Sequence, residues 1–451
     1  MIGRPRFVGV GAVCLAMVGV VPATAQQVAV EQGLAASTLS VYTPPACVPG
    51  VPFADITCTT GFDPWIEQFG LDGITAGCGG GNYCPGTPVT RDQMAVFIEK
   101  AIRGTSNWPP HTVLVFHHPA AEASSDVNSG TELLSMVAAI PSTGSEAPSA
   151  SNPWLIRLGP GIYDLGSGSL TLPTRTALEG AGRDITVITA IGFSNFWHGT
   201  VIMGDHGKLS RLTVNNSGGN SYEIAVDLSS QASEVALEHV TITASNPSNV
   251  TGTAYGVYAD TNTSFSLVDC ELTVHGANLN FGLAAASSTD EARLDGVRVN
   301  VYGSNNSSGA SNGFFGNGAS PAISNSRFYV YDGAVQWGIH AIGGGGALDL
   351  RNSEVYTHGP GAAVYAHDLI ATLLGDFLSS QGYGVDTAGS GLSADISNCN
   401  ITGATNWLNN GSGFAVTVGA SKLVGTTSFG GGTVNCFGNY TGTAFLATTC
   451  P

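Results

Sequence analysis

A six-residue stretch, LEHVTI at 237–242, returns along the second half of the chain and decides the fold. Its pattern is Leu or Ile, any residue, then Asn, Asp, His or Gly, then Val, Cys or Ser, any residue, and an apolar residue. The other copies are LVDCEL at 267–272, LDGVRV at 294–299, ISNSRF at 323–328, LRNSEV at 350–355 and ISNCNI at 396–401, with a looser LLGDFL at 373–378. They begin 23 to 30 residues apart, a spacing typical of repeat arrays.

A second element, centred on glycine, precedes most of these copies by 10 to 12 residues, counted from the glycine position. Its copies are YGVYA at 255–259, FGLAA at 281–285, NGFFG at 312–316, WGIHA at 337–341, AAVYA at 362–366 and YGVDT at 383–387. Two elements in a fixed register indicate a solenoid, in which each coil buries its apolar residues only against its neighbours. Short extended segments and 62 glycines predict a mainly β protein, a parallel β-helix.

The register also predicts which side chains face inward. The residue after the glycine position is large and apolar, and the residue two further on is small, so both should point into the core while the residue between them points out. The Asn, Asp, His or Gly of the six-residue pattern is expected at a bend. A left-handed backbone is cheap there for Asn, Asp and Gly.

The outward positions of the glycine strand define a candidate binding patch. Aromatic rings beside His and Asp suit stacking against a sugar with polar contacts at its edge. The alternative is an ordinary exposed ladder, since aromatic residues favour strands. The carbohydrate-binding candidates on this strand are Tyr258, Phe315, His340, Tyr365, His367 and Asp386, of which all but Tyr258 are expected to form one exposed patch.

The start of the solenoid carries a family resemblance. LGPGIY at 158–163 and LEGAGRDITVI at 178–188 resemble the first coils of pectin-lyase-like β-helix proteins, including pectin methylesterases. The resemblance implies a right-handed parallel β-helix, a polysaccharide as partner, and any active site on the outer face of the glycine strand.

The catalytic motifs of those enzymes do not occur in this chain. Gln-Asp-Thr and Gly-x-Val-Asp-Phe of the methylesterases are missing, as are the Asp-Asp pair and Gly-His-Gly of polygalacturonases. Glycosidases need two carboxyl groups roughly 5–10 Å apart, and Asp260 and Asp386 are expected five rungs apart. We therefore expect no carboxylate pair on this strand and no cofactor or metal. Calcium is the ion that pectate-lyase-like enzymes use, but the sequence shows no acidic cluster that would bind it.

The N-terminus reads as a targeting segment. Arg4 and Arg6 precede an apolar run at 7–21, and small residues at 23–25 form a cleavage site, so 1–25 is predicted to be a signal peptide. The run is short for a membrane span and no second one follows. We expect a secreted, extracellular or cell-surface protein with no membrane span, joined by a linker at 26–46 to its first folded part.

Residues 47–104 predict a helix–loop–helix unit. FADI at 53–56, WI at 65–66, GITAG at 73–77 and VTRDQMA at 89–95 resemble one S-layer-homology module. Such modules bind cell-wall polysaccharide, which implies a cell-envelope glycan as partner. They usually carry Thr-Arg-Ala-Glu, and here Asp-Gln replaces Ala-Glu. Arg91 is a candidate for binding an anionic sugar, or a residue that only caps and solvates its helix.

Eight cysteines follow the signal segment, and an oxidising compartment favours disulfides. Their spacing suggests three local pairs: Cys47 with Cys58, Cys78 with Cys84, and Cys436 with Cys450. The repeat register places Cys270 and Cys399 at one stack position five rungs apart, about 24 Å at ~4.8 Å per rung. That exceeds disulfide reach, so both are predicted to be buried free thiols.

The rest of the chain, 105–451, is assigned to the β-helix, whose two ends need caps. A helix near 131–139 should cover the first coil, and residues 430–451 should close the last.

The formal net charge of −17 argues against nucleic acid and anionic lipid as partners. Two functions stay open. The preferred one is a non-catalytic secreted or cell-surface protein that contacts glycan and is attached through 47–104. The other is a divergent polysaccharide lyase or hydrolase that acts from the exposed face of the glycine strand.

Overall fold

The computed structural model divides the chain into two compact units, Met1–Asn107 and Trp108–Pro451. The predicted signal peptide and all of the predicted linker but residue 46 lie outside the described residues. Among the described helices, none combines the length and apolar character that crossing a bilayer requires. The structure describes residues 46–71, 74–103, 111–115, 129–191, 198–218, 221–229, 231–246, 252–285, 291–303, 309–343, 346–389, 392–411, 413–442 and 444–451.

The described residues of the first unit form two helices, α2 (Asp63–Leu71) and α3 (Arg91–Arg103). At the start of α3, the backbone N–H of Thr90 donates to the Gln93 side chain (3.0 Å), and the N–H of Gln93 donates to the Thr90 hydroxyl (3.4 Å). This reciprocal pair is a capping box. Gln93 therefore performs the capping role that a glutamate also performs at this position.

The loops of the first unit are tied by disulfides Cys47–Cys58 and Cys78–Cys84. Phe53 is buried and its ring lies 5.4 Å from that of Tyr83.

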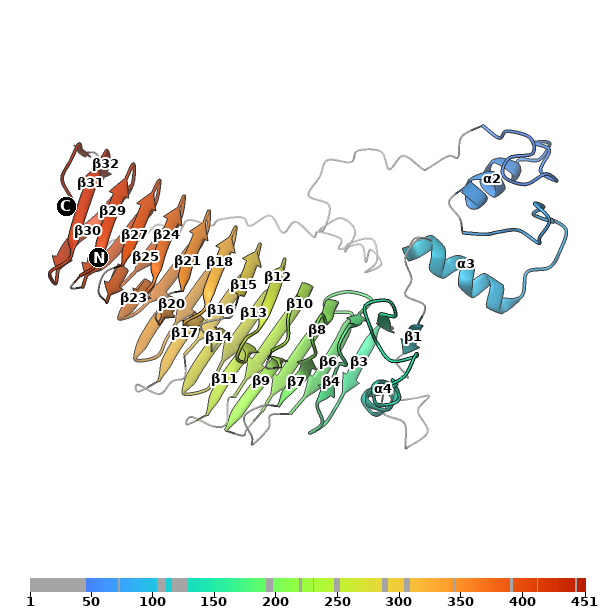
Figure 1. The fold of residues 1–451 in the computed structure, drawn as a ribbon, viewed down its shortest axis with the longest axis horizontal. Coiled ribbons are helices and arrows are strands. Elements are labelled where there is room, and N and C mark those ends of the chain that lie inside the picture. The colour runs from blue at the N-terminus through green and yellow to red at the C-terminus, as the bar shows by residue number, and fades with distance from the viewer. Residues whose placement is uncertain are drawn as a thin grey trace, which may run out of the picture. The chain divides into compact units, whose positions relative to one another are not determined.

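The second unit is a mainly β, parallel β-helix whose strands follow one another along its axis (Figure 1). Each coil contributes a strand to three stacks, which we call sheets 1, 2 and 3. Sheet 1, which holds the glycine strands, contains β4 (Leu170–Thr171), β7 (Gly199–Met203), β9 (Tyr222–Leu228), β11 (Thr253–Ala259), β14 (Leu279–Ala285), β17 (Ala310–Asn317), β20 (Val335–Ile342), β23 (Gly361–His367) and β26 (Tyr383–Ala388).

The six-residue pattern starts in sheet 2 and ends in sheet 3. Sheet 2 contains β1 (His111–Val115), β2 (Trp154–Leu158), β5 (Thr176–Glu179), β12 (Ser264–Val268), β15 (Glu291–Asp295), β18 (Ser320–Ser324), β21 (Ala347–Arg351), β24 (Ile370–Leu374), β27 (Ser393–Ser397), β29 (Ala415–Gly419) and β31 (Thr433–Phe437). Sheet 3 contains β3 (Gly161–Asp164), β6 (Thr186–Ala190), β13 (Glu271–His275), β16 (Arg298–Tyr302), β19 (Arg327–Tyr331), β22 (Glu354–His358) and β25 (Phe377–Ser380).

Four long strands bend from one sheet into the next. β8 (Lys208–Ser217) and β10 (Val235–Ser245) run from sheet 2 into sheet 3, and β28 (Asn400–Asn410) and β30 (Lys422–Phe429) run from sheet 3 into sheet 1. All pairings between coils are parallel. The antiparallel hairpin of β32 (Asn439–Thr441) and β33 (Ala444–Leu446) follows the last coil.

The bend between sheets 2 and 3 confirms the role predicted for the third residue of the six-residue pattern. In successive coils this residue has a left-handed backbone, with φ between 49° and 74°. Asn, Asp and Gly adopt this conformation at little cost, which explains why they dominate the position. The residues concerned are His239, Asp269, Gly296, Asn325, Asn352, Gly375, Asn398 and Ala420.

The next residue of each coil points into the core and forms a polar ladder toward the C-terminal end. The backbone N–H of Ser326 donates to the hydroxyl of Ser353 (3.2 Å), and the N–H of Ser353 donates to the carboxyl of Asp376 (2.9 Å). Cys270 and Cys399 occupy the same stack position, buried and unpaired. Burial raises the pKa of both thiols to about 11, so neither ionises at neutral pH.

The ends of the core are closed differently. α4 (Ser129–Ala138) packs against β3 and β4 and buries Leu133 and Val137 in the same core as the first coils. At the other end Trp407 is buried, its indole N–H donates to the carbonyl of Pro451 (3.4 Å), and Cys436 is bonded to Cys450.

Glycine in sheet 1 is required by the packing of sheet 3. A Cβ added to Gly338 would lie 2.1 Å from the Val355 side chain and 2.6 Å from the carbonyl oxygen of Ala363. A Cβ added to Gly282 would likewise lie 2.3 Å from the Val299 side chain. Two consecutive residues, the glycine and the one after it, therefore face the core. The residue before the glycine and the residue two after it both face outward.

We predict that Gly338→Ala lowers the free energy of unfolding by about 2 kcal/mol or more, because the added methyl overlaps backbone and core atoms. Chemical denaturation followed by far-UV circular dichroism measures this. The matched control is Gly182→Ala, for which the nearest atom to the added Cβ is the terminal Cδ1 of the Ile185 side chain, at 3.1 Å. Equal stability of the two variants would contradict the packing argument.

We predict that Asp376→Asn flattens the dependence of stability on pH. Burial raises the pKa of Asp376 from 3.8 to about 7. The folded chain thus holds this proton more tightly than the unfolded chain, and stability falls as pH rises from about 4 through 7. Asparagine keeps the acceptor for the Ser353 N–H and should be more stable than wild type by about 2 kcal/mol at pH 8. Denaturation midpoints between pH 4 and 8 test this, with exposed Asp395→Asn as the control. Parallel pH profiles for wild type and Asp376→Asn would refute the assignment.

Candidate functional site

A continuous strip of aromatic rings crosses the outer face of sheet 1. We call it the aromatic strip. Neighbouring ring centroids are 4.5–6.1 Å apart along it. Five strands contribute, β11, β14, β17, β20 and β23, which span about 19 Å at ~4.8 Å per strand. Its members are Tyr255, Tyr258, Phe281, Phe315, Trp337, His340, Tyr365 and His367.

The structure brings together four of the residues singled out from the sequence. The Phe315 ring lies 5.2 Å from His340, His340 lies 5.0 Å from Tyr365, and Tyr365 lies 6.1 Å from His367. All four side chains are half-buried, so the strip is less exposed than expected. Asp386 pairs with Tyr365 across β23 and β26, which places it at the end of the strip.

Tyr258 is the exception among the candidates on this strand. It is only 7% exposed and packs with Ile224 and Ala284, so it supports the strip from beneath and does not offer a free ring face. Tyr255, which lies 5.2 Å from it, is more exposed and stacks on Phe281 at 4.9 Å with an interplanar angle of 11°.

Sequence reasoning missed Tyr255, Phe281 and Trp337. Each stands directly before the glycine of its strand, and strict alternation predicts that only the residue two after the glycine faces outward. Because the glycine and the residue after it both face the core, the residue before the glycine lies on the outer face as well. The available signal was the aromatic residue that stands directly before the glycine in four of the strands, Tyr383 on β26 being the fourth.

His340 is held as a neutral ring in the middle of the strip. Its Nδ1 lies 3.0 Å from the amide oxygen of Asn312, and its ring stacks 4.5 Å from Trp337. Burial, followed by the nearby His367, lowers its pKa to about 4. At neutral pH, Nδ1–H therefore donates to Asn312 and Nε2 can accept a hydrogen bond from a ligand hydroxyl.

Asp386 closes the strip toward the C-terminal coils. Its carboxylate accepts a hydrogen bond from the Asn409 side chain (2.9 Å). Burial raises its pKa to about 6, although Asn409 and His367 oppose the shift. Near neutral pH this carboxyl exchanges between a hydrogen-bond donor and an acceptor.

A pair of carboxyl groups lies at the opposite end, where the sequence predicted none. Asp227 on β9 pairs with Tyr258 on β11, and Asp260 directly follows β11. Burial, and then the charge of Asp260, raises the pKa of Asp227 to about 7. Asp227 is therefore an ionisable group under the influence of Asp260 that the sequence analysis did not consider. Asp227 escaped notice because Ala225 replaces glycine in β9, so the glycine motif does not reach that coil.

The remaining candidates lie elsewhere. Arg91 is exposed in the first turn of α3, within the first unit. Among the described residues, Cys47, Cys58 and Glu67 form the one group with metal-ligand spacing, and its two sulfurs are joined in a disulfide.

No protein-family model and no curated protein sequence matches the chain. Several solved structures are similar to it. They include the A-module of the mannuronan C-5 epimerase AlgE6 of Azotobacter vinelandii, at 14% identity and a TM-score of 0.43 over 70% of this chain and 96% of that one. The catalytic unit of a thermostable GH87 alpha-1,3-glucanase from Streptomyces thermodiastaticus is 13% identical, with a TM-score of 0.43 over 75% and 67% of the two chains. A pectin methylesterase in complex with a hexasaccharide is 12% identical, with a TM-score of 0.32 over 59% and 80%. At these identities the likeness concerns the fold alone.

We predict that Asn409→Leu raises the pKa of Asp386 above 6, because it removes the hydrogen bond that favours the ionised carboxyl. Carbon-13 NMR of aspartate-labelled protein measures the titration. Asn435→Leu on β31 is the control, since Asn435 lies in sheet 2. An unchanged or lower pKa in Asn409→Leu would contradict the described contact.

Proposed function

We propose that this protein is a secreted or cell-surface β-helix that binds an extended, uncharged polysaccharide along the aromatic strip without cleaving it. The observation that supports this proposal is the unbroken run of ring contacts over five strands of sheet 1. A strip of about 19 Å matches a chain of several sugar units better than a single small molecule. Half-buried rings offer apolar faces for stacking at low entropic cost because they are already held by their neighbours.

Polar groups at the strip would orient the sugar. The Nε2 atom of neutral His340 can accept from a hydroxyl. Asp386 and Asn409 can donate or accept at one end, and Asp260 can accept at the other. A small number of well-positioned polar groups in an otherwise apolar surface is typical of binding sites that are specific without being strongly charged.

The charge of sheet 1 favours an uncharged glycan. Strands β9, β11, β14, β17, β20, β23 and β26, all of whose residues are described, contain no Lys or Arg. A polyanionic chain would meet three aspartates there and no cation to neutralise it. The formal net charge of −17 adds to this repulsion.

The first unit is proposed to attach the protein to a cell-envelope glycan. Its S-layer-homology resemblance supports this role, and Arg91 is the residue proposed to contact an anionic sugar there. The exposed apolar side chains of α3, Met94, Val96 and Ile98, offer a further surface for docking. The predicted signal peptide and the three disulfides support a location outside the cell.

The carboxyl pair Asp227 and Asp260 favours a second candidate, a polysaccharide lyase or hydrolase. A carboxyl with a pKa of about 7 suits a general acid, and the neighbouring strands place a second carboxyl near it. Against this role, Asp227 is only 4% exposed, which leaves little of it for contact with a substrate.

We predict that Trp337→Ala weakens retention of the protein on an insoluble neutral polysaccharide about tenfold, the loss of one good stacking contact. The assay is a pull-down with cellulose, curdlan and xylan. Tyr356→Ala, which removes an aromatic ring from sheet 3, is the matched control. Equal retention of the two variants would overturn the proposed binding surface.

The same incubations test the enzymatic alternative. The supernatants are assayed for new reducing ends and for unsaturated ends. Retention without either supports the non-catalytic proposal. Product that disappears in Asp227→Asn would establish an enzyme and replace that proposal.

A further inference from the structure

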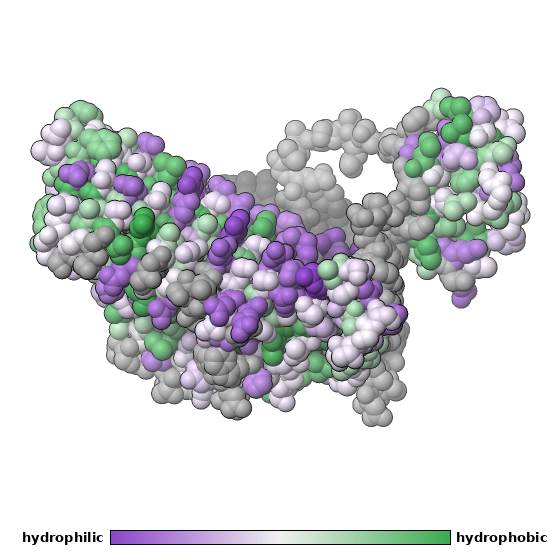
Figure 2. Space-filling model, viewed as in Figure 1, coloured by the Kyte–Doolittle hydropathy of each residue, from purple (hydrophilic) through white to green (hydrophobic). Residues whose placement is uncertain are grey.

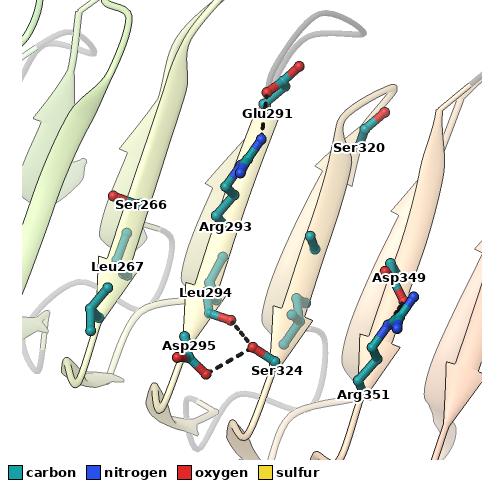
Figure 3. Close-up of a pocket in the computed structure, with 13 residues that line it drawn as sticks. Ser266, Leu267, Glu291, Arg293, Leu294, Asp295, Ser320, Ser324, Asp349 and Arg351 are labelled. Carbon is teal, nitrogen blue, oxygen red and sulfur yellow. Dashed lines mark hydrogen bonds and ion pairs between the residues drawn. The ribbon is translucent and has the colours of Figure 1, made fainter.

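A groove of about 580 Å³ lies on the outer face of sheet 2, across β12, β15, β18 and β21 (Figure 3). Hydrophilic side chains gather over these strands in the space-filling view (Figure 2). The groove belongs to a different face of the coils from the aromatic strip, and no residue is shared between the two.

Small residues make the floor of this groove. Ala322 on β18 lies between Arg293 on β15 and Asp349 on β21 in the strand register. The other outward residues of β18 are Ser320 and Ser324, so this strand has no long side chain on its outer face. The hollow therefore exists because one coil carries only short side chains between two coils that carry long ones.

The walls are built from ion pairs within single strands. Arg293 lies 3.7 Å from Glu291, and Arg351 Nε donates to Asp349 (2.8 Å). Figure 3 shows each arginine lying along its own strand toward its acid. The hydrogen bond to Asp349 orients the Arg351 guanidinium, whereas the Arg293 side chain is 75% exposed and only loosely paired. Both guanidinium groups keep further N–H groups for a ligand.

Asp295 adds a third acid at the lower edge. Its carboxylate accepts from Asn325 (2.7 Å) and from the Ser324 hydroxyl (2.9 Å), and these bonds hold its pKa below the ordinary value. Asp295 is therefore ionised at neutral pH. Two arginines against three carboxylates give the groove a net charge of −1, which disfavours an anionic ligand.

The groove continues past Arg293 and Glu291. A neighbouring hollow of about 420 Å³ shares these two residues and Ser266 with it, and reaches Ser264 and Glu234. Together the two hollows cross five strands, about 19 Å at ~4.8 Å per strand. This length and direction fit a chain molecule that lies across the strands.

We propose that this sheet 2 groove is a second glycan site, which binds an uncharged oligosaccharide independently of the aromatic strip. Sugar hydroxyls both donate and accept hydrogen bonds, so they match guanidinium donors and carboxylate acceptors that alternate along the walls. A flat floor at Ala322 leaves room for the sugar ring between them. One molecule would then hold two glycan chains on two faces.

The test measures binding of cellohexaose, laminarihexaose, maltohexaose and xylohexaose to the full-length secreted protein by saturation-transfer NMR and calorimetry. It is repeated in Trp337→Ala, which disables the aromatic strip. Ala322→Tyr fills the floor, and Arg293→Met removes a donor without adding bulk. The matched control is Ala415→Tyr, an exposed alanine four strands further along sheet 2.

We expect at least one hexaose to bind the Trp337→Ala protein and to lose tenfold or more in affinity in Ala322→Tyr and Arg293→Met, but not in Ala415→Tyr. Absence of hexaose binding in Trp337→Ala, or binding that Ala322→Tyr leaves unchanged, overturns the second site while leaving the aromatic strip intact as a proposal. Binding of hexagalacturonate in preference to the neutral sugars overturns the proposed ligand class.

Discussion

Everything in the β-helix depends on one constraint, the fixed parallel register between successive coils. Each interior side chain packs against its counterpart from the next coil, and each outward side chain stands beside the counterpart on its face. The left-handed residue between sheets 2 and 3 keeps this register, because it turns each coil from His239 onward at the same point. Without it, equivalent residues would not meet, and neither the polar ladder in the core nor the aromatic strip outside could form.

The repeated bend explains why the sequence predicted the fold well. The residue types at the bend and at the glycine reflect backbone conformation and steric limits, and those limits act locally. The positions of β11 to β26 follow from them. The same locality allowed Cys270 and Cys399 to be separated from the other cysteines, since a stack position follows from the register alone.

The site was less accessible to sequence reasoning, and for a physical reason. Which residues face outward depends on the two consecutive core-facing residues at the glycine. This arrangement follows from the close approach of Gly338 to Val355, which the sequence of a single strand does not reveal. How far a side chain is buried depends on neighbouring coils, as Tyr258 shows beneath the strip. Asp227 was missed because its strand lacks the glycine. The sheet 2 groove arises from short side chains on one coil beside long ones on the next.

The three disulfides lie outside the repeated coils or at their last turn, so in the described residues no disulfide links one middle coil to another. Each middle coil presents the same backbone edges above and below. Gain or loss of a single residue within a strand would turn its side chains to the wrong face, whereas gain or loss of a whole coil would preserve every register. In evolutionary terms, the coil is the unit by which such a chain can grow or shrink. The length of either outer face would then change in steps of one strand, without any change in the chemistry that each coil presents.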